Sequence, residues 1–133
     1  MKKKITTLLL CVALLLSSST NLVSQSRPLS GMCIALVHGI LGFDDTQGLV
    51  GGLLKYWGGL DQYLRSQGAI VATPGSSATN SLEVRSTQLK TFLDTWIPAN
   101  NCGRIHLVGH SQGGLVVRYL TTNLGYANRV AMT

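Results

Sequence analysis

Hydrophobic residues in this chain gather in short runs that have little polar character on either face. Three such runs, at 33–38, 69–73 and 104–109, are followed by glycine, proline or polar residues. A short run that is apolar on both faces is typical of a strand covered on two sides, as in a parallel sheet. We therefore predict three strands of a parallel sheet.

Between and after these runs, apolar residues recur every three or four positions. This spacing predicts helices over 57–67, 82–96 and 112–124, and the first and third of them are followed by Gly68 and Gly125 as stop signals. Strands that alternate with helices form βαβ units. We therefore expect an α/β fold, with helices on both faces of a parallel sheet.

The C-terminal part of the chain indicates how much of a domain is present. Pro98 is expected to end the second helix, because proline lacks a backbone N–H. Another strand begins at 129–133, and three strands with a nascent fourth make a thin sheet for a complete α/β domain. We therefore expect 27–133 to be the N-terminal part of a longer α/β domain that is truncated after the helix at 112–124.

The first 26 residues differ in composition from the rest of the chain. A basic start, MKKK, precedes the apolar stretch ITTLLLCVALLL and a small, polar tail, SSSTNLVSQS. This order is typical of a secretory signal peptide, and the apolar stretch is shorter than the about 20 residues that span a membrane. We predict a signal peptide over 1–26, export through the periplasm to the outside, and no stable membrane span after cleavage.

Charge and cysteine content exclude some partners and leave one question open. Without the leader, eight basic and five acidic residues remain, and they are scattered, which argues against nucleic-acid binding. No Cys/His spacing typical of zinc occurs, so we expect no cofactor or metal in this chain. Cys33 and Cys102 each stand near the start of an apolar run. Export permits a disulfide, but bridging neighbouring parallel strands is awkward, so a bond and two buried thiols remain equal alternatives.

The stretch IHLVGHSQGGLVV places a serine between the third strand and the third helix. Gly109, His110, Ser111, Gln112 and Gly113 match the G-x-S-x-G pattern of a nucleophile elbow in its strand–turn–helix context. The glycines allow a tight bend. The serine also stands at a helix N-terminus, where backbone N–H groups favour a developing anion. This motif predicts a serine nucleophile for acyl transfer.

A second motif, LVHGILGFDD, follows the first strand. His38 and Gly39 begin a loop of the kind that supplies the other donor of an oxyanion hole. The donors would be the backbone N–H groups of Ile40 and Gln112. Because both loops leave the carboxyl ends of parallel strands, we expect them to meet in one crevice.

The chain resembles the secreted bacterial triacylglycerol lipases of the α/β-hydrolase fold in these two motifs and in two further stretches, YWGGLDQYLRSQGAIVAT and EVRSTQLKTFLD. The four stretches occur in the same order as in that family, and the resemblance covers nearly all of the chain after residue 26. The resemblance implies an ester hydrolase in which Ser111 is the nucleophile and Ile40 and Gln112 hold the oxyanion. It also implies a lipid or ester substrate at a lipid–water interface and a lid. In some members it implies a structural calcium ion and a steric foldase.

The chain departs from this family after the serine. In this fold the order is Ser, then Asp or Glu, then His, yet no Asp, Glu or His follows Ser111. His110 is expected to point away from the serine, and His38 to stabilise the oxyanion loop. We therefore expect this chain alone to hydrolyse esters poorly. Two alternatives are a non-catalytic or truncated hydrolase chain and a short-chain esterase or acyltransferase.

Ordinary structural roles are expected for the other conspicuous side chains. Tyr56 and Trp57 would pack at a helix start, and His106 would lie within a core strand. Glu83 and Arg85 would stand at the start of the second helix, where a carboxylate near the N-terminus is favourable.

Overall fold

The computed structural model describes residues 27–43 and 54–133. The expected signal peptide therefore lies outside the described residues, as does most of the loop that precedes Tyr56. None of the helices in the two described ranges is long and apolar enough to cross a bilayer.

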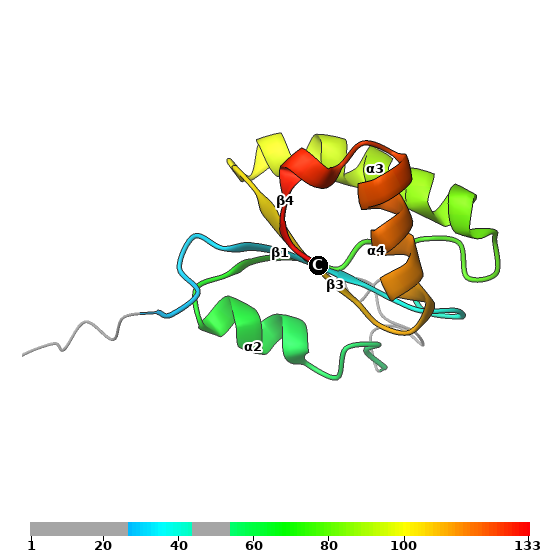
Figure 1. Ribbon diagram of the computed structural model, residues 1–133. Coiled ribbons are helices and arrows are strands. Elements are labelled where there is room, and N and C mark those ends of the chain that lie inside the picture. The colour runs from blue at the N-terminus through cyan, green and yellow to red at the C-terminus, as the bar shows by residue number, and fades with distance from the viewer. Residues whose placement is uncertain (1–26, 44–53) are drawn as a thin grey trace, which may run out of the picture.

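The described chain is an α/β structure in which strands and helices alternate (Figure 1). The sheet has the order β2-β1-β3-β4, and every neighbouring pair is parallel. The predicted parallel sheet and its three helices are thus confirmed, and the nascent fourth strand pairs with the third. The elements are β1 (Cys33–Val37), α2 (Leu60–Ser66), β2 (Ile70–Ala72), α3 (Leu82–Ala99), β3 (Ile105–Gly109), α4 (Gln112–Asn123), a 3-10 turn η1 (Ala127–Arg129) and β4 (Val130–Met132).

Two helix boundaries differ from the expected ones by more than one residue. The helix expected from residue 57 begins at Leu60, because Gly58 and Gly59 take left-handed φ values of 57° and 93° and form a turn first. The expected stop at Pro98 is wrong, since α3 continues to Ala99. A proline in the last turn removes only one backbone bond, and Asn100 closes that turn by donating its N–H to the carbonyl of Trp96 over 3.1 Å.

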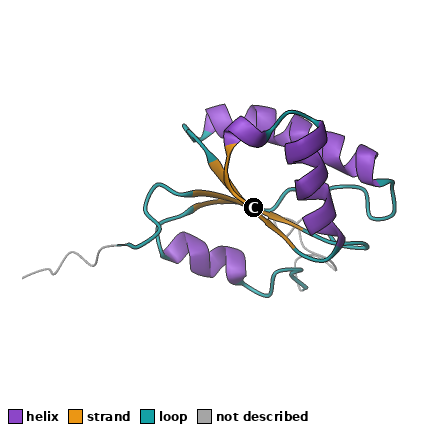
Figure 2. Ribbon diagram, viewed as in Figure 1, coloured by secondary structure: helices purple, strands orange, loops and turns teal. Residues whose placement is uncertain are grey.

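Helices cover both faces of the sheet, as the sequence predicts (Figure 2). The larger core lies between the sheet and α3 with α4, and includes Leu93, Leu107 and Leu120. A smaller core on the other face packs Leu36 against Leu64 of α2, with Trp57 alongside. All five residues of β1 are buried, which is the pattern of a central strand with two covered faces.

Cys33 and Cys102 form a disulfide, with their Cα atoms 6.0 Å apart. This settles the alternative that the sequence left open. Bridging is feasible because Cys102 lies in the turn before β3, outside the strand ladder, whereas Ile105 occupies the position paired with Cys33. The disulfide therefore ties the amino end of β1 to the turn that leads from α3 into β3.

Candidate functional site

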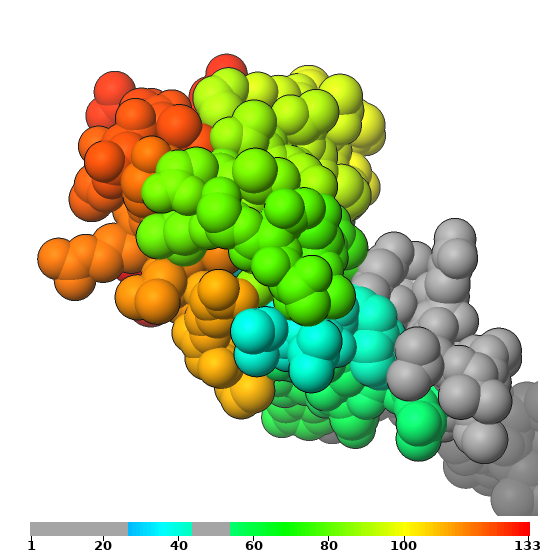
Figure 3. Space-filling view, turned by 90° about the vertical axis from the view of Figure 1, so that its right-hand side faces the viewer, coloured from blue at the N-terminus to red at the C-terminus, as the bar shows by residue number. Residues whose placement is uncertain are grey.

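The two predicted motifs meet at the carboxyl end of the sheet. Val37, the last residue of β1, pairs with Gly109, the last residue of β3, so the loops that follow them start side by side. Figure 3 looks onto this end of the molecule, where the cyan loop after β1 lies next to the orange elbow and below the green segment that leads into α3. The expected crevice partners are therefore adjacent in the fold.

Ser111 occupies a strained turn between β3 and α4. Its φ of 56° and ψ of −126° lie where a non-glycine residue is rarely found, and such strain is concentrated at functional sites. The residue is exposed, and its side chain does not cap α4. Its hydroxyl is therefore presented at the surface, at the positive end of a helix of twelve residues.

The two flanking glycines of the motif allow close backbone approach. A Cβ atom at Gly109 would lie 2.5 Å from the backbone nitrogen of Gly114, across the turn. A Cβ atom at Gly113 would lie 2.1 Å from the carbonyl oxygen of Val37, so the start of α4 packs directly on the backbone of β1. Both positions therefore require glycine on steric grounds.

The loop after β1 lies against the serine. A Cβ atom at Gly39 would be 3.0 Å from the Cβ atom of Ser111. On either side of the predicted donor Ile40, backbone N–H groups are already bonded, that of Gly39 to the hydroxyl of Tyr56 and that of Leu41 to the carbonyl of Ala78. The loop is thus fixed at both flanks of the residue whose N–H is expected to face a substrate.

Arg85 is the main polar anchor of this loop, and its side chain is fully buried at 0% exposure. Its Nη2 donates to the carbonyl oxygens of His38 and Gly39 over 3.0 and 2.9 Å. Its Nη1 donates to the side-chain oxygen of Gln112, the other predicted oxyanion residue. Burial lowers the pKa of Arg85, but an arginine stays protonated in proteins. One buried cation therefore joins the loop to the elbow.

The expectation that Arg85 merely stands at a helix start is wrong. The position of Arg85 in the helical repeat of α3 could have revealed its buried role. Arg85 lies three residues after Leu82 and four before Leu89, on the core-facing side of α3. A long cation on the apolar face of a helix needs polar partners, and here they include backbone carbonyls of the loop after β1. Glu83 does have the expected role, since hydrogen bonds from the backbone and from Ser81 hold its pKa below the usual value.

His38 stabilises the loop, as expected. The ring is 1% exposed, and Nε2 accepts a hydrogen bond from the backbone N–H of Ser76 over 3.1 Å. Its Nδ1 lies 2.9 Å from the carbonyl oxygen of Gly39 and donates to it, which assigns the proton of a neutral ring to Nδ1. Sequence reasoning missed Ser76, because nothing local marks which loop serine will reach a ring 38 positions away.

Tyr56 does more than pack at a helix start. Its hydroxyl accepts the N–H of Gly39 over 2.9 Å and lies 2.6 Å from Nδ1 of His110. Its ring also meets those of His38 and Trp57 edge-on, with centroids 5.7 and 5.3 Å apart. The side chain of His110 is therefore engaged by an aromatic cluster. That it points away from Ser111 stays a prediction.

The remaining candidates lie apart from this site. His106 is half-buried in β3, on the face opposite to Ile105 and Leu107, which belong to the larger core. Within residues 27–43 and 54–133, no group of three or more His, Cys, Asp or Glu could hold a metal ion.

Comparison with known proteins gives partial matches. No family model matches the chain. It is 37% identical over 89 residues to a triacylglycerol lipase of Vibrio cholerae, a match that covers 67% of this chain and 27% of the relative. A triacylglycerol lipase of Pseudomonas fragi is 39% identical over 87 residues, covering 65% and 28%. One of Burkholderia plantarii is 32% identical over 90 residues, covering 65% and 24%. The chain thus spans about a quarter of the length of these curated relatives.

Proposed function

We propose that this protein is a carboxylic-ester hydrolase of the triacylglycerol lipase type. The matches above support this proposal, because they indicate a bacterial triacylglycerol lipase family over a partial, N-terminal region. The observation that carries the proposal is the placement of Ser111. An exposed serine with positive φ, at the start of a helix, lies against a loop whose backbone is fixed by a buried arginine.

In the proposed reaction, Oγ of Ser111 bonds to the ester carbonyl carbon and its proton passes to a general base. The carbonyl oxygen becomes an oxyanion, which the backbone N–H groups of Ile40 and Gln112 stabilise. One such donor lowers the barrier by about 3 kcal/mol. The alcohol then leaves with a proton from the protonated base, and water releases the acid from the acyl-serine.

The orientation of the Gly39–Ile40 peptide supports this role for Ile40. In a planar trans peptide, the C=O and N–H point in opposite directions. Arg85 draws the carbonyl oxygen of Gly39 toward the buried side of the loop. The N–H of Ile40 is thereby turned the other way, toward the exposed surface where the serine lies.

We propose that the general base and the acid that orients it come from outside these 133 residues. A serine hydrolase needs both groups, and no Asp, Glu or His follows Ser111 in this sequence. The three histidines present have other engagements or positions: His38 and His110 are bonded within the loop cluster, and His106 lies within β3.

The test is the Ser111→Ala variant of the full-length protein, assayed with tributyrin, with triolein and with a serine-directed fluorophosphonate. We expect the variant to lose both hydrolysis and labelling, whereas Ser66→Ala, which changes an exposed serine of α2, keeps both. Parent-like hydrolysis by Ser111→Ala would refute the mechanism. A folded parent that neither labels nor cleaves either ester would favour a non-catalytic hydrolase chain, and cleavage of tributyrin alone would favour a short-chain esterase.

We also propose that the protein is exported. The Cys33–Cys102 disulfide supports this, because such bonds persist in oxidising compartments. N-terminal sequencing of secreted material should find a start near residues 25–27, as the leader pattern predicts. A secreted protein that begins at Met1 would contradict the proposed cleavage.

A further inference from the structure

We propose that Tyr56 is a positioning residue that fixes the oxyanion loop to the nucleophile elbow through its hydroxyl. This inference rests on the proposed function. The hydroxyl lies 2.9 Å from the backbone nitrogen of Gly39 and 2.6 Å from Nδ1 of His110. Gly39 immediately precedes the donor Ile40, and His110 immediately precedes Ser111. One oxygen atom therefore joins the two halves of the site, one residue away from each reacting group.

The hydrogen-bond directions at this oxygen are compatible with a stable link. The amide of Gly39 can only donate, so the phenol oxygen accepts there. Where Nδ1 of His110 carries no proton, the phenol donates its hydrogen to that nitrogen. Where Nδ1 carries a proton, Nδ1 donates instead, and the phenol oxygen has a second lone pair to accept it. The link can therefore form whichever ring nitrogen is protonated.

The tyrosine ring is itself held, which makes its hydroxyl a fixed point. It makes edge-on contacts with the rings of His38, Phe43 and Trp57, with centroids 5.3–5.9 Å apart. Such aromatic pairs each contribute about 0.5–1.5 kcal/mol beyond the area they bury. Removing the hydroxyl alone should therefore leave the ring in place and release the link.

Tyr56 and Arg85 act on opposite groups of the same residue. Arg85 holds the carbonyl oxygen of Gly39, and Tyr56 holds its N–H. A loop held only by its carbonyl could still pivot about that bond. The second bond fixes how far the Ile40 N–H stands from the elbow, and a donor must lie about 2.7–3.1 Å from the developing oxyanion to stabilise it.

The decisive variant is Tyr56→Phe in the full-length protein, with Tyr63→Phe as the matched control because Tyr63 is 62% exposed on α2. We expect Tyr56→Phe to lower kcat about tenfold with KM within twofold, since a misaligned donor costs less than the about 10²–10³ of a lost one. Exchange of the Gly39 amide hydrogen should accelerate, and the ¹⁵N shift of His110 Nδ1 should change. Tyr63→Phe should alter none of these.

A double-variant cycle separates a link from two independent roles. If Tyr56 acts through His110, then Tyr56→Phe combined with His110→Ala should lose no more kcat than the larger of the two single variants. If the double variant instead loses kcat by the product of the two single losses, the link is refuted. The link is also refuted if Tyr56→Phe keeps the parent's rate of Gly39 amide exchange and the parent's ¹⁵N shift of His110 Nδ1, two measurements that need no activity. Failure of the proposed function would instead show as full hydrolysis by Ser111→Ala.

Discussion

The two ends of the sheet are held together by different chemistry. At the amino end, a covalent bond joins Cys33 to Cys102 beside apolar side chains such as Ile97 and Ile105. At the carboxyl end, a buried cation, a buried imidazole and a phenol bind backbone groups of the loop after β1. Burial of a polar group is costly unless the group is hydrogen-bonded. The amino end, with its disulfide and apolar side chains, has fewer such groups to satisfy. The carboxyl end instead fixes the direction of individual N–H and C=O groups, which apolar packing cannot do.

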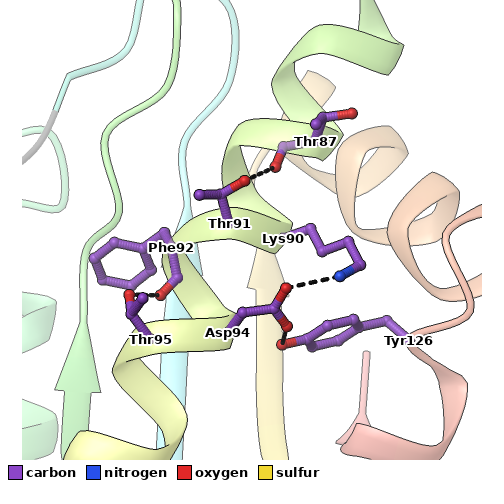
Figure 4. Close-up of polar contacts among 7 residues, drawn as sticks. All are labelled: Thr87, Lys90, Thr91, Phe92, Asp94, Thr95 and Tyr126. Atoms are coloured by element: carbon purple, nitrogen blue, oxygen red, sulfur yellow. Dashed lines mark hydrogen bonds and ion pairs between the residues drawn. The ribbon is translucent and has the colours of Figure 1, made fainter.

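A third contact region joins α3 to Tyr126, which follows α4. Figure 4 shows Lys90 and Tyr126 reaching the two carboxylate oxygens of Asp94, over 2.7 and 3.0 Å. Burial and the bond to Asp94 raise the pKa of Tyr126 well above its usual range. The carboxylate is about half exposed, so this contact should matter less than either end of the sheet.

The largest effect should come from the amino end. Replacing Cys33 and Cys102 together by serine opens a loop of 69 residues, and loss of such a disulfide is expected to lower the free energy of unfolding by about 2–4 kcal/mol. Urea unfolding of the parent and the double variant would measure it. Dithiothreitol should destabilise the parent and leave the variant unchanged. Equal midpoints would show that this end does not depend on the bond.

The next effect should come from the backbone contact under the elbow. Gly113→Ala places a Cβ atom 2.1 Å from the carbonyl oxygen of Val37, and such overpacking is expected to cost about 1–3 kcal/mol. Gly114→Ala is the matched control on the same helix, because its nearest neighbour would be 3.7 Å away. Thermal unfolding of the pair should separate them clearly. A Gly113→Ala variant as stable as Gly114→Ala would mean that α4 can move away from β1.

A smaller loss of stability is expected from Arg85→Lys. The ammonium keeps the charge but cannot form the fork that reaches two carbonyls and Gln112. We expect a loss of about 1–2 kcal/mol in the free energy of unfolding, with faster hydrogen exchange confined to the loop after β1. Exchange that accelerates equally near Cys102 would contradict the separation of the two ends.

The smallest effect should be that of Asp94→Asn, and it should depend on pH. The hydrogen bond from Lys90, and then that from Tyr126, hold the pKa of Asp94 below its usual value. The folded state therefore binds this proton less readily than the unfolded chain, so the contact stabilises the protein above the ordinary carboxyl pKa and ceases to do so as pH falls through the lowered one. At neutral pH we expect a loss of about 0.5 kcal/mol.

The measurement is urea unfolding of the parent and Asp94→Asn across the acidic range. The difference between them should shrink toward zero at low pH. Adding Lys90→Gln to Asp94→Asn should cost little further, since only the contact of Lys90 with the Tyr126 ring is then left to lose. A difference that stays constant with pH would exclude the carboxylate charge as its source.

The same contrast explains which parts of the molecule could be predicted from the sequence. β1 and β3 were predicted to within one residue at each end, because continuous apolar runs are local signals. The elbow was equally visible, since its glycines stand two positions from Ser111. Arg85 and Tyr56 were misjudged because their partners lie 46 and 17 positions away. Periodicity can place a side chain on a face of a helix, but it does not name the distant backbone group that the side chain will meet.

One consequence of the loop geometry concerns how this protein could diversify. At Ile40 the feature expected to contact the reacting oxygen is an amide, which every residue except proline carries. The side chain at this position is 57% exposed, and that of Leu41 is 70% exposed. Substitutions at these two sites could change shape and polarity at the rim while the amide that we propose holds the oxyanion stays in place. Substrate preference would then depend on the side chain of a residue, whereas stabilisation of the oxyanion would depend on its backbone N–H, so the first could change without the second.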